Sequence, residues 1–194
     1  PGGENYSRIK QSLRSRNLHT VCEEARCPNI SECWGAGTAT IMIMGDTCSR
    51  RCKFCSVNTG KPLLLDPYEP SRVAQAIKVW GLKYVVITSV CRDDLGDGGA
   101  EHVYKTIKAV KSLCPRTIVE ILIPDFNGKT DSIKKVVESG SEVISHNIET
   151  VRRLTCKVRD FRASYEQSLS VLKKCKAIAP KVLSLYTFSE QTMT

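Results

Sequence analysis

The sequence has no long apolar run and few aromatic residues, and each absence argues against one class of partner. No apolar run approaches the ~20 residues that a membrane-spanning helix needs, so we expect no membrane association. Aromatic residues make up 6% of the chain, and no stretch interleaves them with basic residues as RNA-binding motifs do. We therefore do not expect nucleic acid as a partner, although the net charge is +9.

The basic residues are dense near the start of the chain, in YSRIKQSLRSRNLHT (6–20). One interpretation is the solvated face of a helix. The other is a docking surface for an acidic partner.

Cysteine is abundant and unevenly placed. Six of the ten cysteines lie between Cys22 and Cys55. A secreted disulfide scaffold would be short and rich in loops, whereas this chain has long periodic segments. The clustering therefore favours metal or iron–sulfur ligation in a reducing compartment.

Apolar runs alternate with helical patterns from residue 38 onward. The runs are TATIMIMG (38–45), KYVVITSV (83–90), TIVEILIP (117–124) and EVISHNIE (142–149). Such runs are typical of parallel strands that are covered on both faces. Apolar stripes with helical spacing follow them at Val73, Ile77 and Trp80; Val103, Ile107 and Val110; Ile133, Val136 and Val137; and Tyr165, Leu169 and Leu172. The order predicts an α/β fold, either an open doubly wound sheet or part of a (β/α) barrel, over residues 38–194, with residues 1–37 as an N-terminal extension.

Polar motifs follow the predicted strands at the edge where reactive groups of such folds gather. They are GDTCSRRCKFCSV (45–57), SVCRDDLGDGG (89–99), PDFNG (124–128) and HNIET (146–150).

Cys48, Cys52 and Cys55 are separated by three and then two residues. A loop of this size can place three thiolates around one iron–sulfur cube and leave the fourth iron open to a small molecule. A structural zinc site would need a fourth ligand, and the next cysteine along the chain is Cys91.

This spacing, with Phe54 before the last cysteine and a strand before the loop, resembles the radical S-adenosylmethionine (SAM) superfamily. The resemblance implies a partial parallel (β/α) barrel with about four to five β/α units. It also implies that Cys48, Cys52 and Cys55 hold a [4Fe–4S] cluster. That cluster would bind and cleave SAM, giving a radical that abstracts hydrogen from an unactivated carbon.

A second trio sharpens the resemblance. VCEEARCPNISECWG (21–35) has four and then five residues between its cysteines, and together with the strand-end motifs it closely resembles the lipoyl synthase family from about residue 5 to about residue 180. The resemblance implies that Cys22, Cys27 and Cys33 hold an auxiliary [4Fe–4S] cluster. In that family this second cluster donates the sulfur that enters C6 and C8 of a protein-bound octanoyl chain.

The resemblance also suggests roles for other residues. Phe54 would pack near the adenine of SAM, and Asn147 and Glu149 would contact SAM, although strand-end hydrogen bonding explains the last two equally well. Asp93, with Asp94, would orient SAM or substrate, or else cap the next helix.

Four further residues are expected to be structural. His146 is interpreted as a hydrogen-bonded histidine at a strand end. Cys114, Cys156 and Cys175 are interpreted as small hydrophobic side chains.

The chain departs from the family at two places. Cys91 replaces an aspartate of the family's segment in TSVCRDD (88–94), and a neutral thiol cannot supply a carboxylate's charge. A thiol so near the site could also be oxidised or interfere with the cluster. After about Val182 the chain reads LSLYTFSEQTMT (183–194), where the family continues with a glycine-rich segment and ends in Arg-Ser-Ser-Tyr. RASY (162–165) matches a different segment, so we expect a barrel that is incomplete at the C-terminal end, with an exposed sheet edge.

The resemblance implies partners and a compartment as well. The substrate carrier would be an octanoylated lipoyl carrier domain or a glycine-cleavage H-type protein, and the electron donor a ferredoxin or flavodoxin. The chain has no short insertion between CWG and TAT, which favours a bacterial cytoplasm over the mitochondrial matrix or plastid stroma. The alternatives are a radical SAM methylthiotransferase acting on tRNA, an inactive cluster-binding fragment and a zinc-binding interaction module.

Overall fold

The four predicted strands are present and lie side by side in one parallel sheet. The computed structural model describes residues 4–16, 18–24 and 28–188. In their order across the sheet the strands are β1 (His19–Thr20), β2 (Thr38–Ile43), β5 (Tyr84–Ser89), β6 (Ile118–Leu122), β7 (Val143–Glu149) and β8 (Leu183–Phe188). Only the short β1 is antiparallel to its neighbour.

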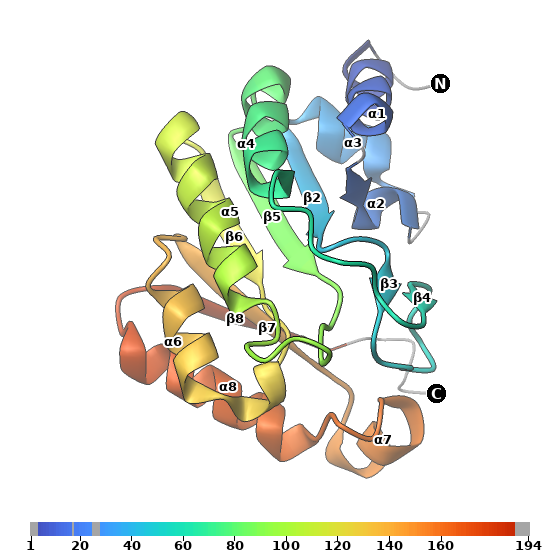
Figure 1. Cartoon of the computed structure of the whole chain (residues 1–194), viewed down its shortest axis with the longest axis vertical. Helices are drawn as coiled ribbons and strands as arrows, with labels where there is room; N and C mark the ends of the chain where they lie inside the picture. The colour runs from blue at the N-terminus through green and yellow to red at the C-terminus, as the bar shows by residue number, and fades with distance from the viewer. Residues whose placement is uncertain (1–3, 17, 25–27, 189–194) are drawn as a thin grey trace.

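The helices alternate with the strands as the sequence predicts. They are α4 (Glu69–Trp80), α5 (Ala100–Leu113), α6 (Thr130–Val137) and α8 (Tyr165–Ile178), and a short helix that was not predicted, α7 (Arg152–Val158), precedes α8. Figure 1 shows α4, α5, α6 and α8 along one side of the sheet, and the described sheet does not close into a barrel. The prediction of a partial (β/α) barrel, with four β/α units and a fifth strand, is confirmed.

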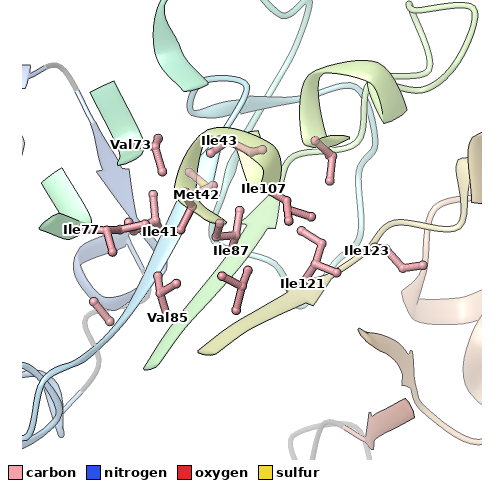
Figure 2. Close-up of a cluster of buried hydrophobic side chains, with 14 of the residues drawn as sticks. Ile41, Met42, Ile43, Val73, Ile77, Val85, Ile87, Ile107, Ile121 and Ile123 are labelled. Carbon is pink, nitrogen blue, oxygen red and sulfur yellow. The ribbon is translucent and has the colours of Figure 1, made fainter. Parts of the chain in front are cut away.

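The core lies between the sheet and the helices. Alternate strand residues such as Ile41, Ile87 and Ile121 point toward the helices and are fully buried, and Ile77 and Ile107 pack on them (Figure 2). This packing fixes the strands, and with them the loops at their carboxyl ends.

The predicted stripe of α8 was wrong. The buried residues are Ser168, Val171 and Cys175, roughly a quarter turn around the helix from Tyr165, Leu169 and Leu172. Tyr165, Leu169 and Leu172 are only half-buried. Small side chains on the inner face allow α8 to lie close to β7 and α6, which it contacts. Cys175 is 1% exposed, in agreement with a structural role.

The N-terminal residues join the same core. β1 pairs with β2 through His19 and Thr20, and α1 (Glu4–Arg16) contacts α4 and α3 (Ile30–Gly35). Leu13 and Trp34 are buried there. The division at residue 37 remains a prediction. Among the described helices, none has the length and apolar character needed to cross a bilayer.

Candidate active site

A cavity of about 290 Å³ lies at the carboxyl ends of the parallel strands. Cys48, Cys52 and Cys55 all line it. Phe54, Asn147 and Glu149, which the sequence also singled out, line it too. The remaining wall is largely apolar and includes Met42, Val90, Leu122 and Ile123. The structure thus places six of the predicted residues around one space.

The loop that carries the three cysteines (residues 45–57, the cysteine loop) begins with a tight turn after β2. Met44 and Gly45 both have positive φ. The Met44 amide donates a hydrogen bond of 2.9 Å to Oε2 of buried Glu69, which also contacts Nε2 of His102 at 2.6 Å. Gly99 lies against this turn, and a Cβ atom there would clash with the Met44 sulfur. Gly99 and His102, in the segment DGGAEH (97–102), therefore help to hold the start of the cysteine loop.

The connection between α7 and α8 holds the far side of the cysteine loop. The Lys53 amide donates to the Val158 carbonyl at 2.8 Å, and the Arg51 amide donates to Asp160 Oδ2 at 2.9 Å. Arg162 Nη2 donates to the Ser49 carbonyl at 2.7 Å. Because these bonds end on backbone atoms of the cysteine loop, they fix the path of this loop along the cavity wall.

Arg50, which the sequence did not single out, joins the cysteine loop to two strand ends. It is 5% exposed, and its guanidinium donates to Asp125 Oδ2 at 2.7 Å, to Asp93 Oδ2 at 2.9 Å and to Asn127 Oδ1 at 2.8 Å. Burial is the largest single influence and would raise the pKa of both carboxyl groups, but the hydrogen bonds and charge of Arg50, together with the other hydrogen bonds to each carboxylate, hold each pKa below its usual range. We call Arg50, Asp93, Asp125 and Asn127 the arginine clamp.

The helix-capping role expected for Asp93 and Asp94 was wrong, while their role in orienting SAM or substrate stays a prediction. Asp93 belongs to the arginine clamp and is not among the residues that line the cavity. Asp94 pairs with Arg92 at 2.7 Å. The start of α5 is instead capped by Asp97, whose carboxylate accepts from the amides of Gly99 and Glu101. The turn through Gly98 and Gly99 displaces the helix start beyond the reach of the two earlier aspartates.

Backbone amides point at two of the cysteine sulfurs. Cys48 Sγ accepts from the amides of Arg50 and Cys91, each at 3.4 Å, and Cys52 Sγ accepts from the Asp160 amide at 3.4 Å. The thiol of Cys91 and these amides lower the pKa of Cys48 despite its burial, whereas burial raises the pKa of Cys52 and Cys55. Amides directed at sulfur favour the thiolate form, which is the form that ligates iron.

Glu149 has an unusual backbone at the end of β7. Its φ is +70°, and the pairing of β7 with β8 shifts register between Asn147 and Glu149. A non-glycine residue in this region is uncommon, and such strain is concentrated at functional sites. Burial raises the pKa of Glu149, although a hydrogen bond from Asn147 opposes the rise.

Three residues that line the cavity each have a buried polar atom without a hydrogen-bond partner among the described residues. They are Ser89 (Oγ), His146 (Nε2) and Arg159 (Nε). His146 is only half satisfied, because Nδ1 lies 2.8 Å from the Ile123 carbonyl and must donate to it. Burial lowers the pKa of His146, so Nε2 is a neutral acceptor at pH 7. A polar ligand would satisfy these atoms, so the residues present fit a bound cofactor such as SAM.

The first cysteine trio is placed only in part. Cys22 is buried in α2 (Val21–Glu24) and Cys33 is half-buried in α3, while Cys27 lies outside the described residues. Neither Cys22 nor Cys33 lines the cavity, but Val21 does. In the described part of the chain, no three His, Cys, Asp or Glu side chains are placed to share one metal ion. Three thiolates that share one zinc ion would lie about 3.8 Å apart, because Zn–S bonds are about 2.3 Å. The thiolates of a [4Fe–4S] cube bind separate irons, so they need not lie close enough to share one ion.

Comparison with known families agrees with this site. A model of the radical SAM superfamily matches residues 42–192, and a model of the N-terminal domain of lipoyl synthase matches residues 1–27. The chain belongs to the radical SAM superfamily. Membership implies a [4Fe–4S] cluster and SAM as cofactors.

Within the superfamily the chain is similar to lipoyl synthases, as its motifs predicted. It is 57% identical over 190 residues to the mitochondrial lipoyl synthase of Rattus norvegicus, covering 95% of this chain and 51% of the relative. It is 57% identical over 178 residues to the lipoyl synthase of Sulfolobus acidocaldarius, covering 92% and 62%. An apicoplast lipoyl synthase of Plasmodium knowlesi is 57% identical over 188 residues, covering 96% and 42%. The chain spans about half the length of the curated relatives it matches.

Solved structures show the same fold at low sequence identity. Methylornithine synthase superposes with a TM-score of 0.56 at 14% identity, covering 94% of this chain and 54% of that one. An FeFe-hydrogenase maturase from Carboxydothermus hydrogenoformans gives a TM-score of 0.60 at 14% identity, covering 91% of this chain and 46% of that one.

The sequence relatives include mitochondrial and apicoplast proteins, so the expected preference for a bacterial cytoplasm is not supported.

Proposed function

We propose that this chain carries the lipoyl synthase reaction, the insertion of two sulfur atoms at C6 and C8 of a protein-bound octanoyl group. The observation that carries the proposal is the cavity that Cys48, Cys52 and Cys55 line together with Phe54, Asn147 and Glu149. Its support is the match of residues 1–27 to the N-terminal domain of lipoyl synthase.

Cys48, Cys52 and Cys55 would hold the SAM-cleaving cluster on the cysteine loop. When bound, the cluster and SAM supply a carbon radical able to remove a hydrogen atom from an unactivated C–H bond. The chain's own contribution is to fix the three sulfurs through the arginine clamp and the contacts to residues 158–162. A loop held in this way loses little conformational freedom when the cluster binds.

The polar atoms of the cavity would orient SAM. Arg159 Nε is a cationic donor suited to the carboxylate of SAM, and the neutral acceptor His146 Nε2 suits a hydroxyl or amino hydrogen. Asn147 and Glu149 would contact SAM from the end of β7, and Phe54 would pack against the adenine. The position of each group at the cavity wall supports these roles.

The apolar wall would receive the octanoyl chain and exclude water from the radical. Met42, Val90, Leu122 and Ile123 come from three neighbouring strands and their ends. An alkyl chain gains about 0.8 kcal/mol per buried CH₂, so eight carbons can be held without polar contacts. Exclusion of water also prevents side reactions of the radical.

Cys22, Cys27 and Cys33 would hold the second cluster, the sulfur donor. Val21 reaches the cavity wall, and its neighbour Cys22 lies at the start of α2. This adjacency supports delivery of sulfur to the same space in which the radical forms.

The octanoylated partner would be a lipoyl carrier domain or a glycine-cleavage H-type protein, and a ferredoxin or flavodoxin would supply electrons. Arg8, Lys10 and Arg14 are exposed on α1, whereas Ile9 and Leu13 face the core. This basic face would attract an acidic carrier. The organellar relatives support a mitochondrial or plastid compartment more than a bacterial cytoplasm.

The test begins with anaerobic reconstitution of the chain, followed by iron and sulfide analysis and EPR. We expect about eight irons per chain, because each [4Fe–4S] cluster contributes four. Cys48→Ser and Cys22→Ser should each remove about half of the iron, while Cys156→Ser, an exposed cysteine outside both trios, should remove none. Zinc without iron would overturn the proposal. A mass gain from sulfur on an octanoylated carrier protein is the final readout.

A further inference from the structure

Cys91, at the end of β5, lies directly beside Cys48. The Cys91 amide is 3.4 Å from Cys48 Sγ, and the Ser49 amide donates to the Cys91 carbonyl at 3.0 Å. The Ser49 hydroxyl donates to the same carbonyl at 2.9 Å. Both cysteines line the cavity, so a small solute can reach them.

The two side chains also influence each other, since the Cys91 thiol is the largest single cause of the lowered pKa of Cys48. The other members of the trio are less well placed. Cys52 Sγ accepts from the Asp160 amide on another element, and Cys55 is exposed. A disulfide needs Cα atoms about 4.4–6.8 Å apart with converging side chains. Two segments joined by a backbone hydrogen bond, with the Cys91 amide on Cys48 Sγ, suit that requirement.

We propose that Cys48 and Cys91 form a reversible disulfide when the cluster-free chain meets hydrogen peroxide. The Cys48 sulfur attacks one peroxide oxygen, the O–O bond breaks, and water leaves with a sulfenic acid on Cys48. The Cys91 sulfur then attacks this sulfur, the S–S bond forms, the S–O bond breaks, and a second water leaves. Two thiols are oxidised by two electrons, and one peroxide is reduced to two waters.

The disulfide would prevent the cluster from binding. It removes one of the three thiolates of the cysteine loop, and a thiol reductant would restore it by exchange. The pairing rests on the contacts between the two segments, whereas its consequence for iron rests on the proposed role of Cys48 as a ligand.

The test uses the full cluster-free chain, treated anaerobically with one equivalent of hydrogen peroxide, alkylated, digested and analysed by mass spectrometry. We expect one crosslinked peptide pair that joins Cys48 to Cys91 and disappears with dithiothreitol. Cys91→Ser should abolish this pair, whereas Cys52→Ser and Cys156→Ser should retain it. A pair that joins Cys48 to Cys52 or Cys55 in the wild-type chain would overturn the inference.

Iron uptake separates this inference from the proposed function. On reconstitution, the peroxide-treated wild-type chain should take up no iron at the cysteine loop until dithiothreitol is added, while treated Cys91→Ser should take up more. If iron binds but no pair with Cys91 forms, the inference fails and the proposed function stands. If the pair forms but iron never binds, the pairing stands and the proposed function fails.

Discussion

The cysteine loop and the N-terminal cysteine segment (described residues 21–24 and 28–35) belong to one core but are held by different forces. The cysteine loop is held by charge-assisted hydrogen bonds from buried Arg50 and by backbone contacts to residues 158–162. The N-terminal segment is held mainly by packing. Trp34 is 1% exposed and its ring lies 5.2 Å from that of Tyr6.

This difference decides what each region responds to. Hydrogen bonds to charged groups fix direction as well as distance, so they can set the orientation of three thiolates. Apolar packing fixes volume and tolerates small changes of direction. We therefore expect the cysteine loop to respond to charge and pH, and the N-terminal segment to respond to side-chain volume.

The largest effect should come from Arg50→Met, which keeps the length of the side chain and removes its charge. Asp125 is 2% exposed and would be left buried without its cation. Breaking a buried pair in this way costs about 3–5 kcal/mol. Urea unfolding measures the loss. Arg51→Met is the matched control, because that side chain is exposed, and it should change the free energy of unfolding by less than about 0.5 kcal/mol. Equal effects of the two changes would show that the arginine clamp does not hold the loop.

A smaller loss should follow Trp34→Phe in the N-terminal segment. Trp34 Nε1 is buried and has no partner among the described residues, so only packing is lost. Removing part of a buried ring should cost about 1–3 kcal/mol, less than complete truncation to alanine. The same urea titration measures it. A loss as large as that of Arg50→Met would remove the distinction between the two regions.

Sequence patterns predicted the strands and the grouping of Cys48, Cys52 and Cys55 on one loop for clear physical reasons. Continuous apolar runs report strands covered on both faces, and the three-two spacing is set by one local loop. The arginine clamp was not predictable in this way, because Arg50 meets partners 43, 75 and 77 residues away. An arginine in a polar loop has the same local pattern whether it is buried or exposed.

Two other differences between the sequence predictions and the structure have a similar origin. The cap of α5 falls on Asp97 because two glycines with positive φ extend the turn, and an aspartate pair alone does not reveal that length. His146 was expected to be satisfied, and only the arrangement of neighbouring strands shows that Nε2 is not. Local patterns predict elements, whereas partners distant in sequence decide how a polar group is used.

The pH dependence of stability should differ between the two variants. The native pKa values of Asp93 and Asp125 are lowered by Arg50, so their contribution is complete above the unfolded value of about 3.9 and is lost as the pH falls through the native values. Wild-type and Trp34→Phe should therefore lose stability in parallel below about pH 4. Arg50→Met should lose less over that range, because its carboxyl groups no longer have lowered pKa values. Urea titrations from pH 7 to pH 3 test this, and parallel curves for all three proteins would contradict it.

The smallest effect concerns Asn127, the uncharged member of the arginine clamp. Its φ is +52°, a region that glycine adopts without cost and alanine does not. Asn127→Gly loses the bonds to Arg50 and Asp93 but relieves the backbone, so we expect a net loss of about 1 kcal/mol or less. Asn127→Ala loses the same bonds and adds about 1–2 kcal/mol of backbone strain. If thermal unfolding ranks the two variants in this order, the backbone conformation of Asn127 matters more than its side-chain bonds. Equal losses would instead assign the whole effect to the hydrogen bonds, and would make Asn127 as much a part of the polar network as the two aspartates.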